Sequence, residues 1–377
     1  MTKIVNSLLA IAVSSSVVLA QGWSGAPGKG LKYDGGDTFS FKMANQLQTH
    51  WVYASNENAA NANGFTVRRA RTSFSGHAYS KAIRYVLTVD GADSAESLKD
   101  GHVTWNFANS DGNSIGLRMG QGKTQFGLEG TGSSKGLFFV ERSTTARAFS
   151  DARSRGAWLQ GSHVDNSLRW AFGAMNGAAT KAFGNGGEAA ANTTDELSYV
   201  AAVNFDPMGD ITGGKTNESL RQGDFREGDR ALVGTVGAAV AIENTSNGTV
   251  DVDNMTFNVN TAWAVEGFQF MGEYFSLTNE VDGAAGSDPE ATGFAVSGNY
   301  VMPKSGDSGI QWGFGARLSQ VDMTEMAGGD EVTDISLVAN AYYHGHACKT
   351  QFEVTQRDAD LADTTDYIFS VAFQILF

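Results

Sequence analysis

Basic side chains that could bind anions recur along the chain, and some share one face of an alternating pattern. Arg69 and Arg71 stand two positions apart in "FTVRRARTSFSG" (65–76), and Arg84 lies in the alternating stretch "KAIRYVLTVD" (81–90). Guanidinium and ammonium groups donate charge-assisted hydrogen bonds to carboxylate and phosphate oxygens. The candidate anion contacts are Arg69, Arg71, Arg84, Arg118, Lys123, Lys135, Arg142 and Arg147.

Residue patterns that would indicate catalysis or metal binding are weaker in this sequence. The six histidines have no Ser or Asp at a spacing that indicates a catalytic triad, although triad residues need not be close in sequence. His344 and His346 could bind a metal from one strand face, but their place beside Tyr342 and Tyr343 at a strand end favours an interfacial pair. We therefore expect no enzyme activity, no metal site and no cofactor.

The elements that must position these residues are strands, because apolar and polar residues alternate with period two through most of the chain. In "TFSFKMANQLQTHWVYA" (38–54), for example, Phe39, Phe41 and Met43 alternate with Ser40 and Lys42. An even number of such strands is typical of a closed transmembrane antiparallel β-barrel, and a soluble β-sandwich or β-helix is the alternative. About sixteen strands can be assigned, near 37–53, 64–76, 81–90, 97–108, 113–121, 155–165, 167–178, 196–206, 229–244, 252–265, 267–278, 291–303, 309–322, 333–345, 347–357 and 366–377.

The connections between these strands differ in length. Short turns such as 164–166 alternate with long polar stretches at 179–195, 207–228 and 279–290. Outer-membrane barrels have short periplasmic turns and long extracellular loops, so we expect these three stretches on the extracellular side. No shift in composition marks a second domain, and 21–377 is expected to form a single barrel.

Composition limits the class of protein. The chain has 46 glycines, four prolines and 11% aromatic residues, which fits strands joined by turns better than helices. Its formal net charge of -14 argues against nucleic acid as a partner, because phosphate backbones attract basic surfaces. The mean hydropathy of -0.22 is compatible with a membrane barrel, because half of each strand faces water.

Both ends of the chain indicate the envelope of a Gram-negative bacterium. Residues 1–20, with Lys3 followed by an apolar stretch and small residues before Gln21, are predicted to be a secretory signal peptide. In "YIFSVAFQILF" (367–377), apolar residues alternate up to Phe377. Such a strand would close a barrel against its first strand and leave no unpaired edge in lipid. The aromatic end resembles the signal that outer-membrane barrels present to their assembly machinery, so we expect an outer-membrane protein surrounded by lipid.

This environment decides where the arginines point. Arg69 and Arg71 share one strand face, and a guanidinium at the bilayer midplane costs roughly 2–4 kcal/mol, so that face should line the lumen. Arg68 then falls on the outer face or near an interface, where its side chain could reach water. Structural pairing with carboxylates such as Asp90 or Asp100 is the alternative to anion binding for these arginines.

One connection breaks the pattern of polar loops. Residues 122–154 contain several apolar side chains, among them Phe126, Phe138, Phe139 and Phe149, together with basic ones. A connection this long and apolar is usually functional. Folding into the lumen would bury its aromatic rings and narrow the pore, and charged side chains there would set ion selectivity.

At this point the sequence resembles a known family, the phosphate-selective porins O and P. The resemblance rests on "FTVRRARTSFSG" (65–76), "LKDGHVTW" (98–105), "RMGQGKTQFGLEGTGSSKGLFFVERS" (118–143) and "FGAMNG" (172–177). It implies a sixteen-stranded barrel, a homotrimer, an inward third loop from Gly122 to Arg153 and basic lumen residues that bind anions. The family's basic pair falls on Arg68 and Arg69.

The chain departs from that family in one respect. Phosphate-selective members carry a ladder of closely spaced arginines, whereas the nearest equivalents here, Arg221, Arg226 and Arg230, are set among carboxylates. The expected function is an outer-membrane porin for small hydrophilic solutes and ions, with a preference for anions such as phosphate. The alternatives are a surface anchor or adhesin that acts through its long acidic loops, and an outer-membrane barrel hydrolase.

Overall fold

The computed structural model describes residues 22–92, 98–110, 113–150, 153–165, 167–176, 197–213, 216–228, 230–246, 251–281, 288–304, 309–326 and 328–377. The expected signal peptide at 1–20 lies outside these residues. No helix among them is both long and apolar enough to cross a membrane.

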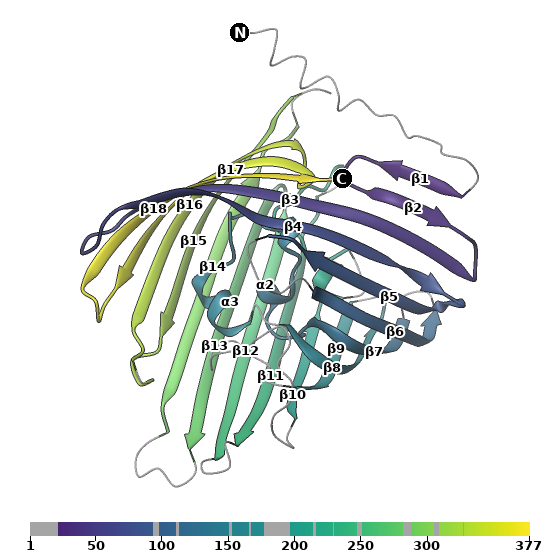
Figure 1. The fold of residues 1–377 in the computed structure, drawn as a ribbon, viewed down its shortest axis with the longest axis horizontal. Coiled ribbons are helices and arrows are strands. Elements are labelled where there is room, and N and C mark those ends of the chain that lie inside the picture. The colour runs from purple at the N-terminus through teal and green to yellow at the C-terminus, as the bar shows by residue number, and fades with distance from the viewer. Residues whose placement is uncertain are drawn as a thin grey trace.

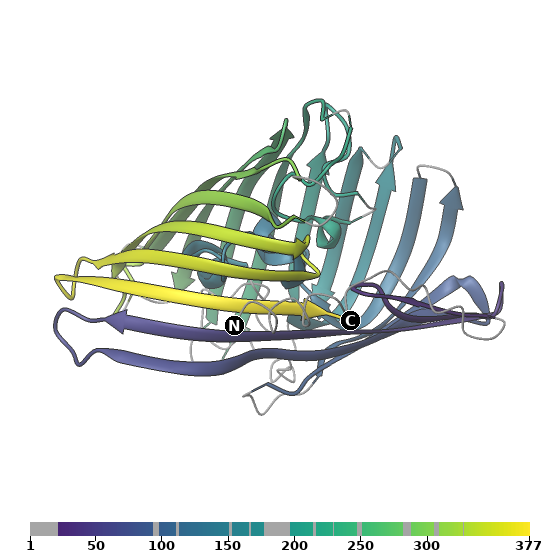
Figure 2. The ribbon, with the colours of Figure 1, turned by 90° about the horizontal axis from the view of Figure 1, so that it is seen from above.

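Within these ranges, sixteen antiparallel strands, β3 to β18, form a closed barrel (Figure 1). Each pairs with its neighbours in sequence, and β18 pairs with β3 to close the ring, as the yellow and purple strands of Figure 2 show. The strands are β3 (Phe39–Ser55), β4 (Ala62–Ala78), β5 (Ser80–Asp90), β6 (Leu98–Ser110), β7 (Asn113–Lys123), β8 (Arg153–His163), β9 (Leu168–Met175), β10 (Ser198–Phe205), β11 (Val233–Ser246), β12 (Asp251–Val265), β13 (Phe268–Val281), β14 (Glu290–Val301), β15 (Gln311–Asp322), β16 (Glu331–His344), β17 (Cys348–Ala359) and β18 (Thr364–Leu376).

The sixteen strands expected from the alternating pattern are confirmed. The largest difference in a boundary is at β11, which was expected from 229 and begins at Val233. Along β16, Ile335 and Leu337 are 47% and 55% exposed, whereas Ser336 between them is fully buried. This alternation gives the barrel an apolar outer face for lipid and a polar inner face.

A short hairpin precedes the barrel and was not expected from the sequence. It consists of β1 (Trp23–Ala26) and β2 (Gly30–Asp34), and β2 pairs with Ser40 to Met43 of β3. Because β18 pairs with β3 only from Gln46 onward, the hairpin covers the edge of β3 that β18 leaves open. Gly30 is required in this turn, since its φ is 73° and a Cβ would lie 2.1 Å from the Met43 carbonyl oxygen.

The long connection between β10 and β11 lies at the end opposite to the one expected. Asp206 N–H donates to the Ser167 carbonyl at 2.7 Å, and Glu266 N–H donates to the Arg230 carbonyl at 3.2 Å. The connection therefore lies with the short turns after β8 and β12, so its expected placement with the extracellular loops is wrong. Antiparallel strands return to the same end after every second strand, and this connection follows the eighth strand of the barrel.

Leu337→Arg should destabilise the barrel by roughly 2–4 kcal/mol, because Leu337 lies midway along β16 and faces lipid. Tyr343→Arg, near the end of the same strand, should cost only about 0–1 kcal/mol. Urea unfolding in lipid vesicles measures both values. Equal costs at the two positions would contradict the assigned membrane depth.

Candidate channel constriction

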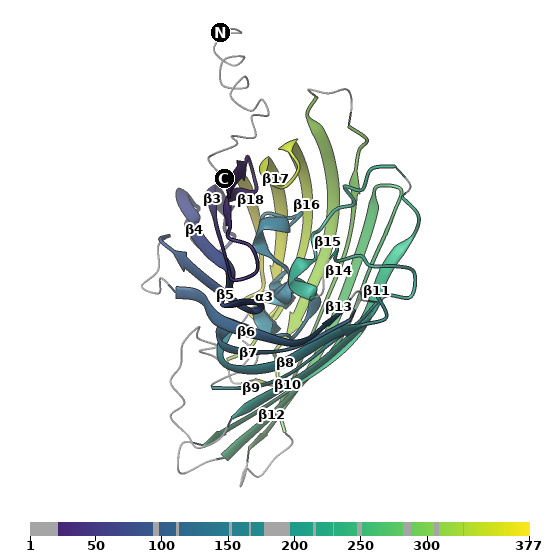
Figure 3. The same ribbon diagram turned by 90° about the vertical axis from the view of Figure 1, so that its right-hand side faces the viewer.

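The connection between β7 and β8 is folded into short helices and packs against the polar inner face of the strands. It contains α2 (Leu128–Thr131), the 3₁₀ turn η2 (Ser134–Gly136) and α3 (Thr144–Phe149). Figures 1 and 3 both place α3 within the ring of strands, and Figure 1 places α2 beside it. We refer to residues 124–150 as the first segment.

Aromatic side chains dock the first segment on the wall. Phe149 stacks on Phe275 of β13 with ring centroids 5.2 Å apart and an interplanar angle of 7°. Phe138 packs with Tyr342 of β16, at 6.2 Å between centroids. All of these rings are at most 1% exposed. Each fully buried aromatic side chain contributes about 1.5–3 kcal/mol, so these contacts favour one fixed position of the first segment.

Polar side chains of the wall satisfy the segment's backbone. Glu273 of β13 accepts hydrogen bonds from the N–H groups of Leu128 and Glu129, at the start of α2. Asn340 and Gln351 both donate to the Phe138 carbonyl, at 2.9 and 2.7 Å. Buried backbone groups need such partners, because leaving one unpaired costs about 1–3 kcal/mol.

Arg68 and Arg69 of β4 both bind Glu141 of the first segment. Arg68 Nε lies 2.7 Å from Glu141 Oε1, and Arg69 donates to both carboxylate oxygens at 3.0 and 2.7 Å. Of the two places expected for Arg68, the outer face is wrong, because its guanidinium binds Glu141 inside the barrel. A β-bulge shifts the register between Gln48 and Thr49 of β3, and the extra residue turns both arginines to the same side.

The pKa of Glu141 reflects this arrangement. Burial by itself would raise it, but the charges of Arg69 and Arg68 hold the pKa of Glu141 at about 2. Its carboxylate therefore occupies both guanidinium groups across the physiological pH range. Arg69, which is 2% exposed, is a structural ion-pair partner rather than an open anion contact.

Two other candidate anion contacts also have structural positions. Arg142 is 4% exposed and donates to the carbonyls of Glu129 and Gly132, near the end of α2. Lys123 is buried and donates to the carbonyls of Gly130 and Gly132, both at 2.6 Å. Basic groups next to the last carbonyls of a helix satisfy its free acceptors. The roles of Arg142 and Lys123 as anion contacts remain predictions.

Arg71 and Arg118 follow the alternative of pairing with carboxylates. Arg71 Nε lies 2.6 Å from Asp90 Oδ2, as that alternative expected, and Arg118 lies 2.8 Å from Glu218. Arg153 Nε lies 2.9 Å from Asp100 Oδ1. In the described residues Arg84 and Arg147 make no ion pair, and both are exposed, Arg84 on the inner face of β5 and Arg147 on α3.

Lys135 differs from these residues, because in the described part of the chain it has no carboxylate partner. It lines a cavity of about 160 Å³ together with Arg71, Lys123 and Arg153. We call this the upper cavity. Burial, followed by the nearby charges of Arg221, Lys42 and Arg71, lowers the pKa of Lys135 to about 8. Neither Arg221 nor Lys42 forms an ion pair within the described ranges, so three basic groups share this region.

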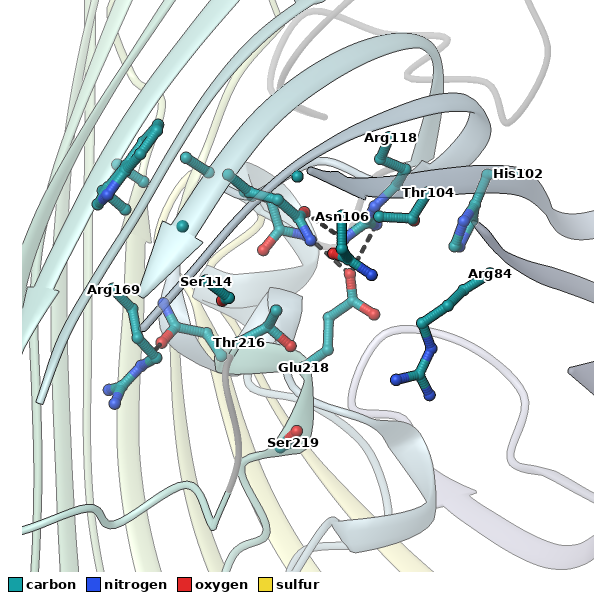
Figure 4. A pocket seen from close by; sticks show the side chains of 18 of the residues that line it. Arg84, His102, Thr104, Asn106, Ser114, Arg118, Arg169, Thr216, Glu218 and Ser219 are labelled. Carbon is teal, nitrogen blue, oxygen red and sulfur yellow. Dashed lines mark hydrogen bonds and ion pairs between the residues drawn. The ribbon is translucent and has the colours of Figure 1, made fainter. Parts of the chain in front are cut away.

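A larger cavity of about 440 Å³ lies along β5 to β10 (Figure 4). We call it the lower cavity, because it is lined by the parts of β7, β8 and β9 that lie nearest the short turns. Its charged lining residues are Lys81, Arg84, Arg118, Arg169 and Glu218. The two cavities share Glu218 as a lining residue.

The histidine pair does not form the site considered from the sequence. His346 is buried and its Nε2 lies 2.8 Å from the Gln222 carbonyl, whereas His344 is exposed. The expectation that both lie at an interface is wrong for His346. Across the described ranges, no group of three or more His, Cys, Asp or Glu side chains is arranged to hold a metal ion.

Sequence reasoning named Asp90 and Asp100 as alternative partners of the arginines. It did not pair Glu141 or Glu218 with an arginine, or Glu273 with the backbone of the first segment. Glu141, Glu218 and Glu273 belong to different parts of the chain, and each meets its partner only through the closed barrel. Glu141 is the one with a signal in the sequence, since it lies in the same apolar connection as the expected pore residues. Glu218 and Glu273 carry no such signal.

Comparison with known proteins agrees with this architecture. The family of phosphate-selective porins O and P matches residues 41–321. The outer membrane channel DcaP of Acinetobacter baumannii aligns with a TM-score of 0.60 at 13% identity, over 90% of this chain and 98% of that chain. An anion-selective porin from Comamonas acidovorans gives 0.59 at 12% identity, over 90% and 100%. No match was found among curated protein sequences.

The closed barrel, its apolar outer face and its polar interior define an outer-membrane channel protein of the porin class. The chain belongs to the family of phosphate-selective porins O and P, as its sequence motifs indicated. Its location is the outer membrane of a Gram-negative bacterium.

Glu141→Gln should lower the free energy of unfolding at pH 7 by roughly 3–5 kcal/mol, because Arg69 would stay buried without its counter-charge. A carboxyl group whose pKa is lower in the folded than in the unfolded protein stabilises the folded state at pH values above its unfolded pKa. The difference between the two proteins should therefore vanish as the pH falls from 4.5, the ordinary value, to about 2. Denaturant unfolding in vesicles across this range measures it, with Glu280→Gln, an exposed site on β13, as control. A pH-independent difference would contradict the ion pair.

Proposed function

We propose that the protein is a channel for passive diffusion of small hydrophilic solutes and ions, narrowed by the first segment and preferring anions. The observation that carries the proposal is the basic group formed by Lys135, Arg221 and Lys42 at the first segment. Within the described residues these three cations have no carboxylate partner, whereas the arginines around them do. A ring or cluster of uncompensated charge in a narrow pore selects ions of the opposite sign.

The preference should extend to small anions in general. Two-pronged binding of phosphate needs a guanidinium whose fork is free, and the forks of Arg69, Arg71 and Arg118 already face carboxylates. In the basic group, Arg221 is then the one guanidinium without an ion pair among the described residues, rather than one of a ladder of arginines. Lys135 and Lys42 act as point charges, which attract anions without imposing a geometry. Phosphate is therefore one permeant anion among several in this proposal, despite the family's name.

Two partners are proposed, a second and third copy of this chain and the assembly machinery. We propose a homotrimer, since one solved relative, OmpT of Vibrio cholerae, is described in a trimer form with a TM-score of 0.54 at 13% identity. We also propose that Phe377 contacts the assembly machinery. Its side chain is 53% exposed, and its backbone pairs with Asn45 at the base of β3.

Conductance in a planar lipid bilayer tests the proposed channel. Discrete steps, and a reversal potential of anionic sign in a salt gradient, are the expected results. Adding phosphate to a chloride gradient should change the reversal potential little. A folded barrel that gives no steps would contradict the channel and favour the surface-anchor or hydrolase alternatives.

Lys135→Gln combined with Arg221→Gln should shift the reversal potential toward cations, because two uncompensated charges leave the constriction. We expect the ratio of anion to cation permeability to fall at least about threefold. Lys29→Gln, in the exposed turn between β1 and β2, removes a similar charge elsewhere and should change nothing. An unchanged reversal potential in the double variant would place the selective region elsewhere.

The anion preference should also depend on pH. The pKa of Lys135 is lowered to about 8, so its charge is present below pH 8 and lost above it. Permeability to anions relative to cations should therefore fall between pH 7 and 9. Lys135→Met should remove this dependence, and the same slope in the variant would show that another group titrates.

A further inference from the structure

A second connection also packs against the inner face of the barrel, and it comes from the opposite end. We infer that residues 206–213 and 216–228, the second segment, complete the constriction, and that Glu218 within it limits the preference of the channel for anions. This inference rests on the proposed channel function. It adds a selectivity residue outside the first segment.

The wall holds the second segment at several points. Arg169 of β9 binds both carboxylate oxygens of Asp206 at 2.6 and 2.7 Å, and its Nε donates to Asn217 at 3.1 Å. Further along, Gly267 N–H donates to Asp224 at 3.0 Å. Arg169 and Asp206 are both nearly fully buried. Arg169 thus holds both Asp206, at the start of the second segment, and Asn217, eleven residues further along it.

The second segment also binds the first. Gln222 accepts a hydrogen bond from Phe138 N–H at 2.7 Å, and its own N–H donates to the Gly136 carbonyl at 2.8 Å. Leu220 packs against Leu128 in a buried cluster. The two segments, which enter the barrel from opposite ends, therefore contact each other through hydrogen bonds and an apolar cluster. Together they line one side of the passage.

Glu218 lies at this boundary. The 3₁₀ turn η3 (Asn217–Ser219) presents it to Arg118 and Gln125, both at 2.8 Å (Figure 4). Its side chain is 35% exposed, although its partner Arg118 is 4% exposed. Because Glu218 lines both cavities, an ion that passes from one to the other meets its carboxylate.

The charge balance shows what this carboxylate does. Among the described residues that line the lower cavity, Glu218 is the one acidic side chain. Of the four basic lining residues, Arg169 is paired with Asp206 and Lys81 with Asp37, so Glu218 opposes the charges of Arg118 and Arg84. It neutralises Arg118 directly and lowers the positive potential that an anion meets. In a narrow pore of low dielectric, one charge has a large effect on selectivity.

Glu218→Gln is the first test, since the amide keeps the size of the side chain and removes its charge. The ratio of anion to cation permeability should rise at least about twofold. Glu227→Gln removes an exposed carboxylate from the same segment, outside both cavity linings, and should leave the ratio unchanged. An unchanged or lower ratio in Glu218→Gln would overturn the role of Glu218.

A second test asks whether the second segment is part of the constriction. Replacing 211–223 by a short Gly-Ser linker should raise the single-channel conductance at least about twofold. Native-like heat resistance on gels would show that the barrel has folded. An unchanged conductance in a folded variant would overturn the second segment as a boundary of the passage.

Crosslinking separates this inference from the channel function. With Cys348→Ser as background, cysteines in place of Gln125 and Glu218 should be joined rapidly by a short bis-thiosulfonate reagent, whether or not the protein conducts. A pair of Gln125→Cys with Glu227→Cys is the control and should not react. Absence of crosslinking in the first pair would contradict the contact between the segments, even in a protein that forms channels.

Discussion

The pairing of β18 with β3 is the constraint on which the rest of the structure depends. Lipid offers no hydrogen-bond partner to a free strand edge, so the sheet must close on itself. Closure sends alternate side chains to the lipid and to the interior, and this explains both the exposed Leu337 and the buried Ser336 beside it. The hairpin β1–β2 extends the same principle to the part of β3 that β18 does not reach.

A polar interior in turn explains how two connections are held within the ring. A barrel of sixteen strands is too wide for its own side chains to fill. Glu273, Asn340 and Gln351 therefore bind the backbone of the first segment, and Arg169 binds the second. The buried arginines are used mainly for this anchoring. The charge that remains for permeating ions is carried by the group around Lys135 together with Arg84 and Arg147, and Glu218 opposes it.

The sequence determines the barrel more fully than the constriction, for physical reasons. A period of two, repeated over sixteen strands, is an intrinsic signal, because each strand must present one face to lipid. The bulge that turns Arg68 inward interrupts that period by one residue, and no residue pattern in the sequence indicates its position. The ion pair of Arg69 with Glu141 joins residues that are 72 positions apart, so no local pattern predicts it. The end of the barrel at which the connection between β10 and β11 lies could have been predicted by counting strands, since parity decides it, whereas the length of 207–228 alone indicated the wrong end.

The buried hydrogen bond between Gln46 and Gln374 has a consequence for the order of folding. It joins the closing strands at 3.0 Å, and its two residues are 328 positions apart in the chain. Contacts between residues so distant in sequence carry a large loss of chain entropy, so they form after the local hairpins. A shift of one residue between β3 and β18 would send these amides toward lipid. The Gln46–Gln374 hydrogen bond therefore stabilises the correct register of β3 and β18 at the last step of assembly, when the fifteen other strand pairings have already formed.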